Sequence, residues 1–144
     1  MKDPQLSVIL PVYNESESIS PVIWEIVGVL EGMPDTSWEL LAVDDGSTDG
    51  TDSTLADLQS AMPQLRVLRL ERNCGQSAAL WMGFQQARAP WIATLDADGQ
   101  NDPADLPALW AKRDEADAVF GYRASRQDRW SKRVGSRMAN AIRN

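Results

Sequence analysis

Five short apolar runs recur along the chain at a nearly regular interval. They are rich in Val, Ile and Leu and lie at 6–12, 38–43, 66–70, 91–95 and 118–121. Such runs, bounded by polar turn residues, predict five β-strands. Because the runs are almost continuously apolar instead of alternating with polar residues, both faces of the resulting sheet should be covered.

The intervals between these runs carry apolar residues at helical spacing. Representative positions are Val22, Ile26 and Leu30, then Leu55, Leu58 and Met62, then Leu80, Phe84 and Ala87, then Leu106, Leu109 and Trp110. The spacing predicts four helices. Three of them are expected to begin at Ser20-Pro21, Asp52 and Asp102-Pro103, which supply a capping oxygen or a preset first dihedral angle. Repeated strand–helix–strand units indicate an α/β fold with a mostly parallel sheet and helices on both faces.

Polar residues follow each predicted strand, at the end where ligands of parallel α/β sheets bind. The five strand ends read Tyr13-Asn14-Glu15, Asp44-Asp45-Gly46-Ser47, Arg72-Asn73, Asp96-Ala97-Asp98-Gly99-Gln100 and Tyr122-Arg123. Loops are generally polar, so any one of these segments could be an ordinary turn. Since three of the five carry carboxylates, together they favour a shared site.

Asp96 and Asp98 lie two positions apart directly after an apolar run. Two hard oxygen donors at this spacing suit Mg²⁺ or Mn²⁺, and Gln100 could add a carbonyl oxygen. Such cations usually bridge to substrate phosphates, so the motif points to a diphosphate ligand. The alternative is that the aspartates cap the helix near Pro103, although Asp102 is better placed for that task.

Asp44 and Asp45 end the second predicted strand and precede a glycine and small hydroxyl residues. A carboxylate in this position can accept hydrogen bonds from a nucleobase or from ribose hydroxyls. A helix-capping loop would account for Ser47, Thr48 and Asp49, but it would not explain the other two acids, Asp44 and Asp45. We therefore expect their uncompensated charge to need a donor.

Composition narrows the possible chemistry. The chain has 144 residues, which fits one domain, and it contains no histidine and a single cysteine. Histidine-dependent nucleophilic catalysis, histidine metal sites and internal disulfides are therefore excluded. The chain has no apolar run of about 18 residues and no apolar stretch near its start. The sequence thus predicts a cytoplasmic location.

The net charge of −7 is unevenly distributed. Residues 1–65 carry twelve acids and one base, 66–121 carry eight acids and six bases, and 122–144 carry one acid and seven bases. In that last segment, Trp130, Val134, Met138 and Ile142 recur at helical spacing. A basic amphipathic helix of this kind lies on anionic membrane surfaces. The alternative is an ordinary surface helix that packs its apolar stripe on the domain.

Several segments resemble the nucleotide-sugar half of the family 2 glycosyltransferases. They are Leu6–Glu15, Val43–Asp49, Arg72–Gln76 and Leu95–Pro103. The similarity is greatest to the polyprenyl-phosphate branch, which includes dolichyl-phosphate mannose synthases and undecaprenyl-phosphate sugar transferases. The Asp-Ala-Asp-x-Gln form of the acidic motif and the segments 121–123 and 132–140 support that branch.

The resemblance implies a GT-A, Rossmann-like fold, with a donor-binding region at 1–121 and the start of an acceptor- and membrane-facing region at 122–144. It implies a metal-dependent, inverting transfer of a sugar from a UDP- or GDP-linked donor to a polyprenyl phosphate. Magnesium or manganese would be the cofactor, and the protein would sit peripherally on the cytoplasmic face of the membrane. No nucleic acid partner is expected.

The resemblance also assigns roles to individual residues. The nucleotide-sugar pocket would include Pro11, Tyr13, Glu15, Asp44, Asp45 and Asp96. The catalytic residues would be Asp96, Asp98 and Arg123, the metal site Asp96, Asp98 and Gln100, and the acceptor-phosphate site Arg123, Lys132 and Ser136. Gly75 and Gln76 could offer helical N–H groups to the diphosphate, but a simple glycine turn is an equal explanation.

Three other interpretations of the function are possible from the sequence. A non-catalytic nucleotide-sugar-binding fragment is the main one, because family members continue well beyond this length and we expect a truncated acceptor side with little transfer. A phospho-acceptor receiver domain would place its acid pair after the first strand and a lysine after the fifth. A dinucleotide-binding oxidoreductase would need a Gly-x-Gly-x-x-Gly motif after the first strand, where this chain has Pro11–Glu15.

Overall fold

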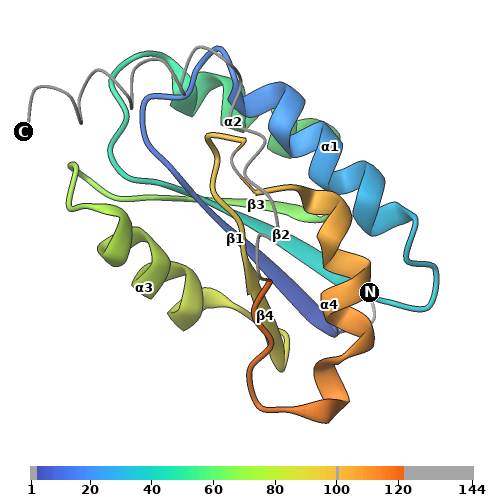
Figure 1. Ribbon diagram of the computed structural model, residues 1–144. Coiled ribbons are helices and arrows are strands. Elements are labelled where there is room, and N and C mark those ends of the chain that lie inside the picture. The colour runs from blue at the N-terminus through green and yellow to red at the C-terminus, as the bar shows by residue number, and fades with distance from the viewer. Residues whose placement is uncertain (1–2, 100, 122–144) are drawn as a thin grey trace, which may run out of the picture. The chain divides into compact units, whose positions relative to one another are not determined.

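The computed structural model describes residues 3–99 and 101–121 (Figure 1). Strands and helices alternate through β1 (Leu6–Val12), α1 (Ile19–Glu31), β2 (Trp38–Asp44), α2 (Thr51–Ala61), β3 (Leu65–Arg69), α3 (Gln76–Gln86), β4 (Trp91–Thr94), the 3₁₀ turn η1 (Pro103–Asp105) and α4 (Leu106–Ala111). These elements form one compact unit. A second unit begins at Lys112, and its described part contains the 3₁₀ turn η2 (Arg113–Glu115).

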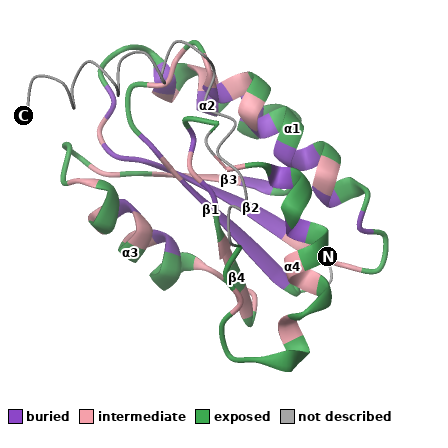
Figure 2. Cartoon of the chain, in the orientation of Figure 1, coloured by how far each residue is buried: buried purple, intermediate pink, exposed green. Residues whose placement is uncertain are grey.

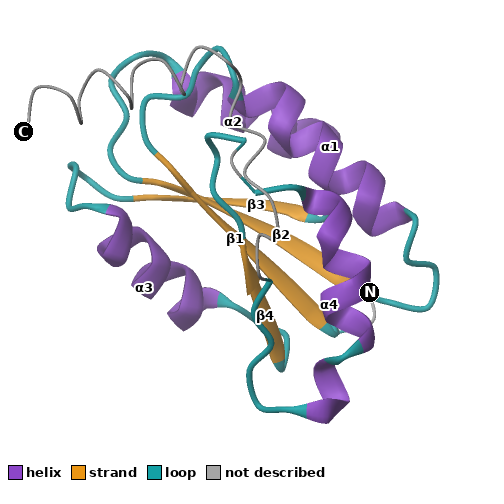
Figure 3. Ribbon diagram, in the orientation of Figure 1, coloured by secondary structure: helices purple, strands orange, loops and turns teal. Residues whose placement is uncertain are grey.

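The sheet of the first unit is parallel throughout, in the order β3-β2-β1-β4 (Figure 3). Four of the predicted strands are confirmed to within one residue at each end. The fifth prediction, a strand at 118–121, is wrong, because these residues form neither strand nor helix and Phe120 is 88% exposed. A run of four apolar residues does not by itself specify a strand, since extended backbone also needs a neighbour to pair with.

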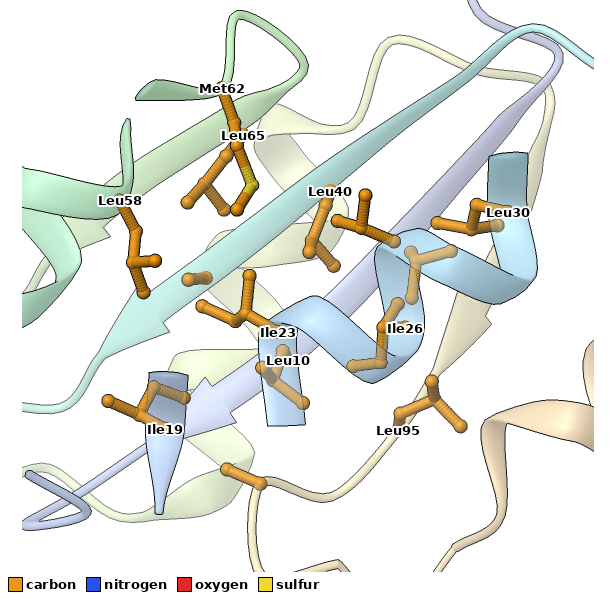
Figure 4. Packing of buried hydrophobic residues seen from close by; sticks show 14 of the residues in the cluster. Leu10, Ile19, Ile23, Ile26, Leu30, Leu40, Leu58, Met62, Leu65 and Leu95 are labelled. Carbon is orange, nitrogen blue, oxygen red and sulfur yellow. The ribbon is translucent and has the colours of Figure 1, made fainter. Parts of the chain in front are cut away.

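The helices cover both faces of the sheet, as predicted (Figure 2). On one face, α1, α2 and α4 bury the larger part of the core, in which Ile23 and Ile26 of α1 pack around Leu10 and Leu40 (Figure 4). On the other face, α3 packs against β1 and β2. Successive residues of the central strands β1 and β2 therefore face different helices, which explains why these two strands are mostly apolar on both faces.

α3 lies unusually close to the sheet at Gly83. A Cβ atom at this position would meet Cγ2 of Ile9 at 2.5 Å, which is inside van der Waals contact. Since only glycine lacks that atom, Gly83 allows the helix to approach β1 this closely. The approach fixes the position of α3, whose first residue lies at the candidate site described below.

The helix starts agree only partly with the predictions. Asp102 caps η1 by accepting a hydrogen bond of 2.9 Å from the Ala104 amide, as expected. The expected start of α1 at Ser20-Pro21 is wrong by two residues, because Ser18 is the N-cap and Pro21 lies in the first turn. Proline is tolerated there since amides in the first helical turn have no partner within the helix.

A buried polar network closes the sheet at the amino ends of its strands. Glu39 of β2 accepts hydrogen bonds from the Ser7 hydroxyl (2.7 Å), the Arg88 amide (2.8 Å) and Nη1 of Arg66 (2.9 Å). Burial alone would raise the pKa of Glu39, but these hydrogen bonds and the Arg66 charge together lower it. The charge of this carboxylate is thus matched by a cation from the neighbouring strand β3.

None of the described helices is long and apolar enough to cross a membrane.

Candidate functional site

An open cavity of about 330 Å³ lies beyond the carboxyl ends of β1, β2 and β4. Four of the five polar segments that follow the predicted strands contribute to it, with Asn73 coming from the segment after β3. Its lining includes six residues from the predicted set, which are Pro11, Tyr13, Glu15, Asp45, Asp96 and Asp98. Asn73, Gly75 and Gln76, at and before the start of α3, complete one side.

The loops after β1 and β2 are tied to each other by reciprocal hydrogen bonds. The Asn14 amide donates to the Ser47 hydroxyl, and the Thr48 amide donates to Oδ1 of Asn14, both at 2.9 Å. The Glu15 amide donates to the Thr51 hydroxyl at 2.9 Å. Asn14 has a φ of 52°, a left-handed conformation that asparagine tolerates better than most residues. These contacts hold Glu15 at the edge of the cavity.

Helix α2 begins differently from the prediction. Its N-cap is Gly50, and Asp52 lies within the first turn, where it pairs with Arg69 instead of capping. The hydrogen bond from Arg69 lowers the pKa of Asp52. Asp49, the residue before the N-cap, accepts hydrogen bonds from the hydroxyl and amide of Thr51 at the first position of the helix. These hydrogen bonds lower the pKa of Asp49 to about 2. The hydroxyl-rich turn is therefore structural, as the capping interpretation proposed.

Asp45 connects the end of β2 to the loop that precedes α3. Its two carboxylate oxygens accept hydrogen bonds from the amides of Cys74 (2.7 Å) and Gly75 (2.8 Å). The next residue, Gly46, has a φ of 70°, and a Cβ there would meet the carbonyl carbon of Arg72 at 2.5 Å. The β2 turn and the β3–α3 loop are thus in backbone contact, and only glycine fits between them.

Asp44 is fully buried and does not line the cavity. Its Oδ1 accepts a hydrogen bond from the Ser47 amide at 2.9 Å, and its Oδ2 lies 3.4 Å from Nε of Arg69. The sequence interpretation expected the charges of Asp44 and Asp45 to need donors beyond the loop itself. The structure supplies hydrogen-bond donors to both oxygens of Asp45, whereas the Oδ2 atom of Asp44 is buried with only the Arg69 ion pair among the described residues. Only Asp45 lines the cavity.

Asp96 is held by two side-chain amides. Nε2 of Gln76 donates to its Oδ1 at 2.9 Å, and Nδ2 of Asn101 donates to its Oδ2 at 3.1 Å. Sequence reasoning missed both contacts, although Gln76 was noted for its backbone. The only available signal was that each amide lies in a segment bordering a predicted strand end. Asp98, two residues on, is exposed.

The other predicted site residues lie outside the described part of the chain. They are Gln100, Arg123, Lys132 and Ser136, and the predicted amphipathic helix also lies there. In the described ranges 3–99 and 101–121, no group of three or more His, Cys, Asp or Glu side chains is placed to hold a metal ion. Of the three predicted metal ligands, the structure describes Asp96 and Asp98, and both line the cavity.

The described residues give the lining of the cavity a strongly negative charge. Among the described lining residues there is no lysine or arginine, and there are four carboxylates, Glu15, Asp45, Asp96 and Asp98. The hydrogen bonds that Glu15, Asp45 and Asp96 accept come from hydroxyl, backbone and side-chain amide groups, none of which carries a charge. Such a cavity repels a bare diphosphate and attracts a divalent cation, for which carboxylate oxygens are suitable ligands.

Comparison with known proteins identifies the class. Residues 7–143 match the family described as Glycosyl transferase family 2, and the chain belongs to that family. A particular relative is a dodecaprenyl-phosphate galacturonate synthase from Rhizobium johnstonii, which is 38% identical over 130 residues. The match covers 86% of this chain and 37% of that protein, so the chain spans little more than a third of the relative's length. The predicted resemblance to the polyprenyl-phosphate branch is confirmed.

Solved structures agree with the fold. The mannosyltransferase PcManGT from Pyrobaculum calidifontis, in complex with GDP-Man and Mn²⁺, superposes with a TM-score of 0.63 at 26% identity, over 78% of this chain and 32% of that one. TarS 1–349 from S. aureus, in complex with UDP, gives 0.60 at 23% identity, over 86% of this chain and 40% of that one. The second likeness concerns the fold alone. The predicted GT-A, Rossmann-like fold is confirmed.

Proposed function

We propose that this chain is the donor-binding region of a glycosyltransferase that moves a sugar from a UDP- or GDP-linked donor to a polyprenyl phosphate, with inversion. The observation that carries the proposal is the cavity in which carboxylates from the ends of β1, β2 and β4 meet without a described cationic side chain. Because these carboxylates repel a diphosphate, a nucleoside diphosphate should bind there together with a cation. The same cavity has carboxylates that can bind the cation and others that can accept hydrogen bonds from the nucleoside.

Asp96 and Asp98 would hold Mg²⁺ or Mn²⁺, with Gln100 as a further ligand. The bound cation supplies positive charge that offsets the negative charge of the departing nucleoside diphosphate. Tyr13, Glu15 and Asp45 line the cavity beyond β1 and β2 and would contact the base and ribose. The division of the cavity follows the family resemblance, and the GDP-Man and Mn²⁺ named for PcManGT support a nucleotide donor bound together with a cation.

The absence of histidine is compatible with the proposed reaction. A phosphate monoester has a second pKa of about 6, so a polyprenyl phosphate is mostly dianionic at neutral pH and can attack the anomeric carbon without a strong base. Arg123, Lys132 and Ser136 would bind this phosphate, and cationic side chains suit that task. The name of the Rhizobium relative, a dodecaprenyl-phosphate galacturonate synthase, supports a polyprenyl acceptor.

The basic segment 122–144 would hold the protein peripherally on the cytoplasmic face of a membrane. Seven bases against one acid give this segment the charge that anionic lipids attract. Replacing Lys132, Arg133 and Arg137 with Gln should weaken sedimentation with anionic liposomes, more so at low salt than at high salt. Equal sedimentation of the variant and the original chain would contradict this part of the proposal.

Calorimetry with UDP, GDP and their common sugar conjugates, each with and without Mn²⁺, tests donor binding. We expect binding heat for one nucleotide series, and only when Mn²⁺ is present. The absence of metal-dependent heat in every series would overturn the proposal. Radiolabelled nucleotide-sugar incubated with a polyprenyl phosphate then separates a catalytic chain from a fragment that only binds the donor.

A further inference from the structure

We infer that Gln76 is a positioning residue, which holds the carboxylate of Asp96 in the orientation that receives the cation. The inference rests on the proposed metal-dependent donor binding. It assigns a task to the Gln76 side chain, whereas the sequence had suggested only a backbone contribution from the start of α3. The geometry that supports it lies entirely within the first compact unit.

The contact itself joins two elements that are twenty residues apart in sequence. Nε2 of Gln76, the first residue of α3, lies 2.9 Å from Oδ1 of Asp96, which follows β4. Asn101 occupies the other oxygen of Asp96 at 3.1 Å. Each carboxylate oxygen therefore has one lone pair engaged by an amide and keeps another for a ligand. Rotation of the carboxylate would break both hydrogen bonds.

The backbone around Gln76 is held in place both before and after this residue. The preceding amides of Cys74 and Gly75 are bound by Asp45, so the loop cannot move away from the end of β2 without exposing that carboxylate. Further along α3, Gly83 seats the helix against Ile9. Asp45 and Asp96, on either side of the cavity, are thus linked through three consecutive residues of one loop and helix start.

A carboxamide is suited to this task because it donates a hydrogen bond without carrying a charge. A lysine or arginine in the same place would also orient Asp96, but it would neutralise the carboxylate and compete with the cation. Arg66 does this to Glu39 at the opposite end of the sheet. The neutral donor leaves the negative charge of Asp96 available, as outer partners of metal-binding carboxylates commonly do.

The test measures Mn²⁺ binding by the whole 144-residue chain, from the electron paramagnetic resonance signal of free Mn²⁺, in the presence of UDP and in a parallel series with GDP. Gln76→Leu should weaken Mn²⁺ binding about tenfold, the lower end of what the loss of such an outer partner costs. Gln76→Asn should weaken it similarly, since its amide is one methylene too short. Gln76→Lys should weaken it further.

Gln85→Leu is the matched control, because Gln85 is exposed on the same helix and does not line the cavity. Its Mn²⁺ binding should equal that of the unmodified chain. If the unmodified chain binds Mn²⁺ with nucleotide but Gln76→Leu and Gln76→Asn bind it within twofold of that value, the inference is wrong while the proposed function stands. If the unmodified chain binds no Mn²⁺ with either nucleotide, the proposed function fails and the inference fails with it.

A double-mutant cycle separates positioning from a merely structural role. In an Asp96→Asn background, Gln76→Leu should cause no further loss of Mn²⁺ binding, because the group that it positions is already altered. Additive losses would show that Gln76 acts through something other than Asp96, and would overturn the inference. Thermal unfolding of each variant, expected within about 0.5 kcal/mol of the original for an exposed residue, accompanies the titrations.

Discussion

Acidic residues at the two ends of the parallel sheet have different kinds of partner. At the amino ends of the strands, Glu39 is buried and paired with Arg66, and its remaining hydrogen bonds come from Ser7 and the Arg88 amide. At the carboxyl ends, Glu15, Asp45 and Asp96 accept hydrogen bonds from uncharged hydroxyl and amide groups. A cation thus matches the charge of Glu39, whereas neutral donors hold these three carboxylates.

The same difference separates two adjacent residues. Asp44 points to the face where the neighbouring Arg69 of β3 lies beside it, in register. Asp45 follows the strand and turns toward the cavity, where backbone amides hold it. A carboxylate at the end of a strand is therefore a ligand candidate only where no cationic side chain from a neighbouring strand has already neutralised it.

Removing one charge at the carboxyl end should have the largest effect. Asp98→Asn takes away one of the two described carboxylates that we propose as metal ligands, so Mn²⁺-dependent nucleotide binding should fall by more than about 100-fold, beyond the loss expected for an outer partner. The midpoint of thermal unfolding should hardly change, because Asp98 is exposed. Calorimetry measures the first quantity and circular dichroism the second.

Asp57→Asn is the control for that variant, since it removes the same charge from an exposed position on α2. Its nucleotide binding should be unchanged. A large drop in thermal stability of Asp98→Asn would show instead that this aspartate has a structural task.

Removing the cation at the amino end should affect stability and not binding. Arg66→Met leaves the buried carboxylate of Glu39 without its charged partner, which should lower the free energy of unfolding by about 2 kcal/mol, within the range for hydrogen bonds to charged groups. Urea unfolding measures this change. Arg88→Met is the control, because Arg88 reaches Glu39 through its backbone amide and its side chain is exposed. Impaired nucleotide binding by Arg66→Met would contradict the division between the two ends.

The smallest expected effect is the pH dependence that Glu39 contributes at the amino end. Because folding lowers the pKa of Glu39 below its usual value of 4.5, its ionisation contributes stability above that pH. The contribution is lost as pH falls through the lowered pKa of the folded state. The stability difference between the original chain and Glu39→Gln should thus be constant from about pH 7 to pH 5.5 and shrink below pH 4.5, by urea unfolding. If the difference in free energy of unfolding grew as the pH fell, folding would raise the pKa of Glu39 instead of lowering it, and the prediction would be wrong.

Much of the fold could be predicted from local pattern. β1 and β2 are buried on both faces, and β3 and β4 are partly buried, so their apolar runs stand out from the polar residues that bound them. The same criterion failed at 118–121, where four apolar residues have no strand structure. Helix starts were less certain, because several neighbouring polar residues compete to cap, and at α2 the first-turn acid pairs with Arg69 instead.

The candidate site was predicted in part, for a related reason. Parallel strands bring all their carboxyl ends to one edge, so Glu15, Asp45, Asp96 and Asp98 could be grouped from their positions after the strands alone. The contact between Gln76 and Asp96 could not, since it joins residues twenty positions apart. Asp44 was grouped with Asp45 because adjacency in sequence does not reveal which face of the sheet a side chain meets.

The sequence by itself determined the alternation of strands and helices, the acidic character of one sheet edge and the family to which the chain belongs. These properties depend on residue type and on the spacing of residues that are close together in sequence. Only the tertiary structure decided which acids keep their charge for a ligand. That depends on whether a cation such as Arg66 or Arg69 arrives from another strand, or a neutral amide such as Gln76 from a helix start, and such partners meet only when the sheet assembles.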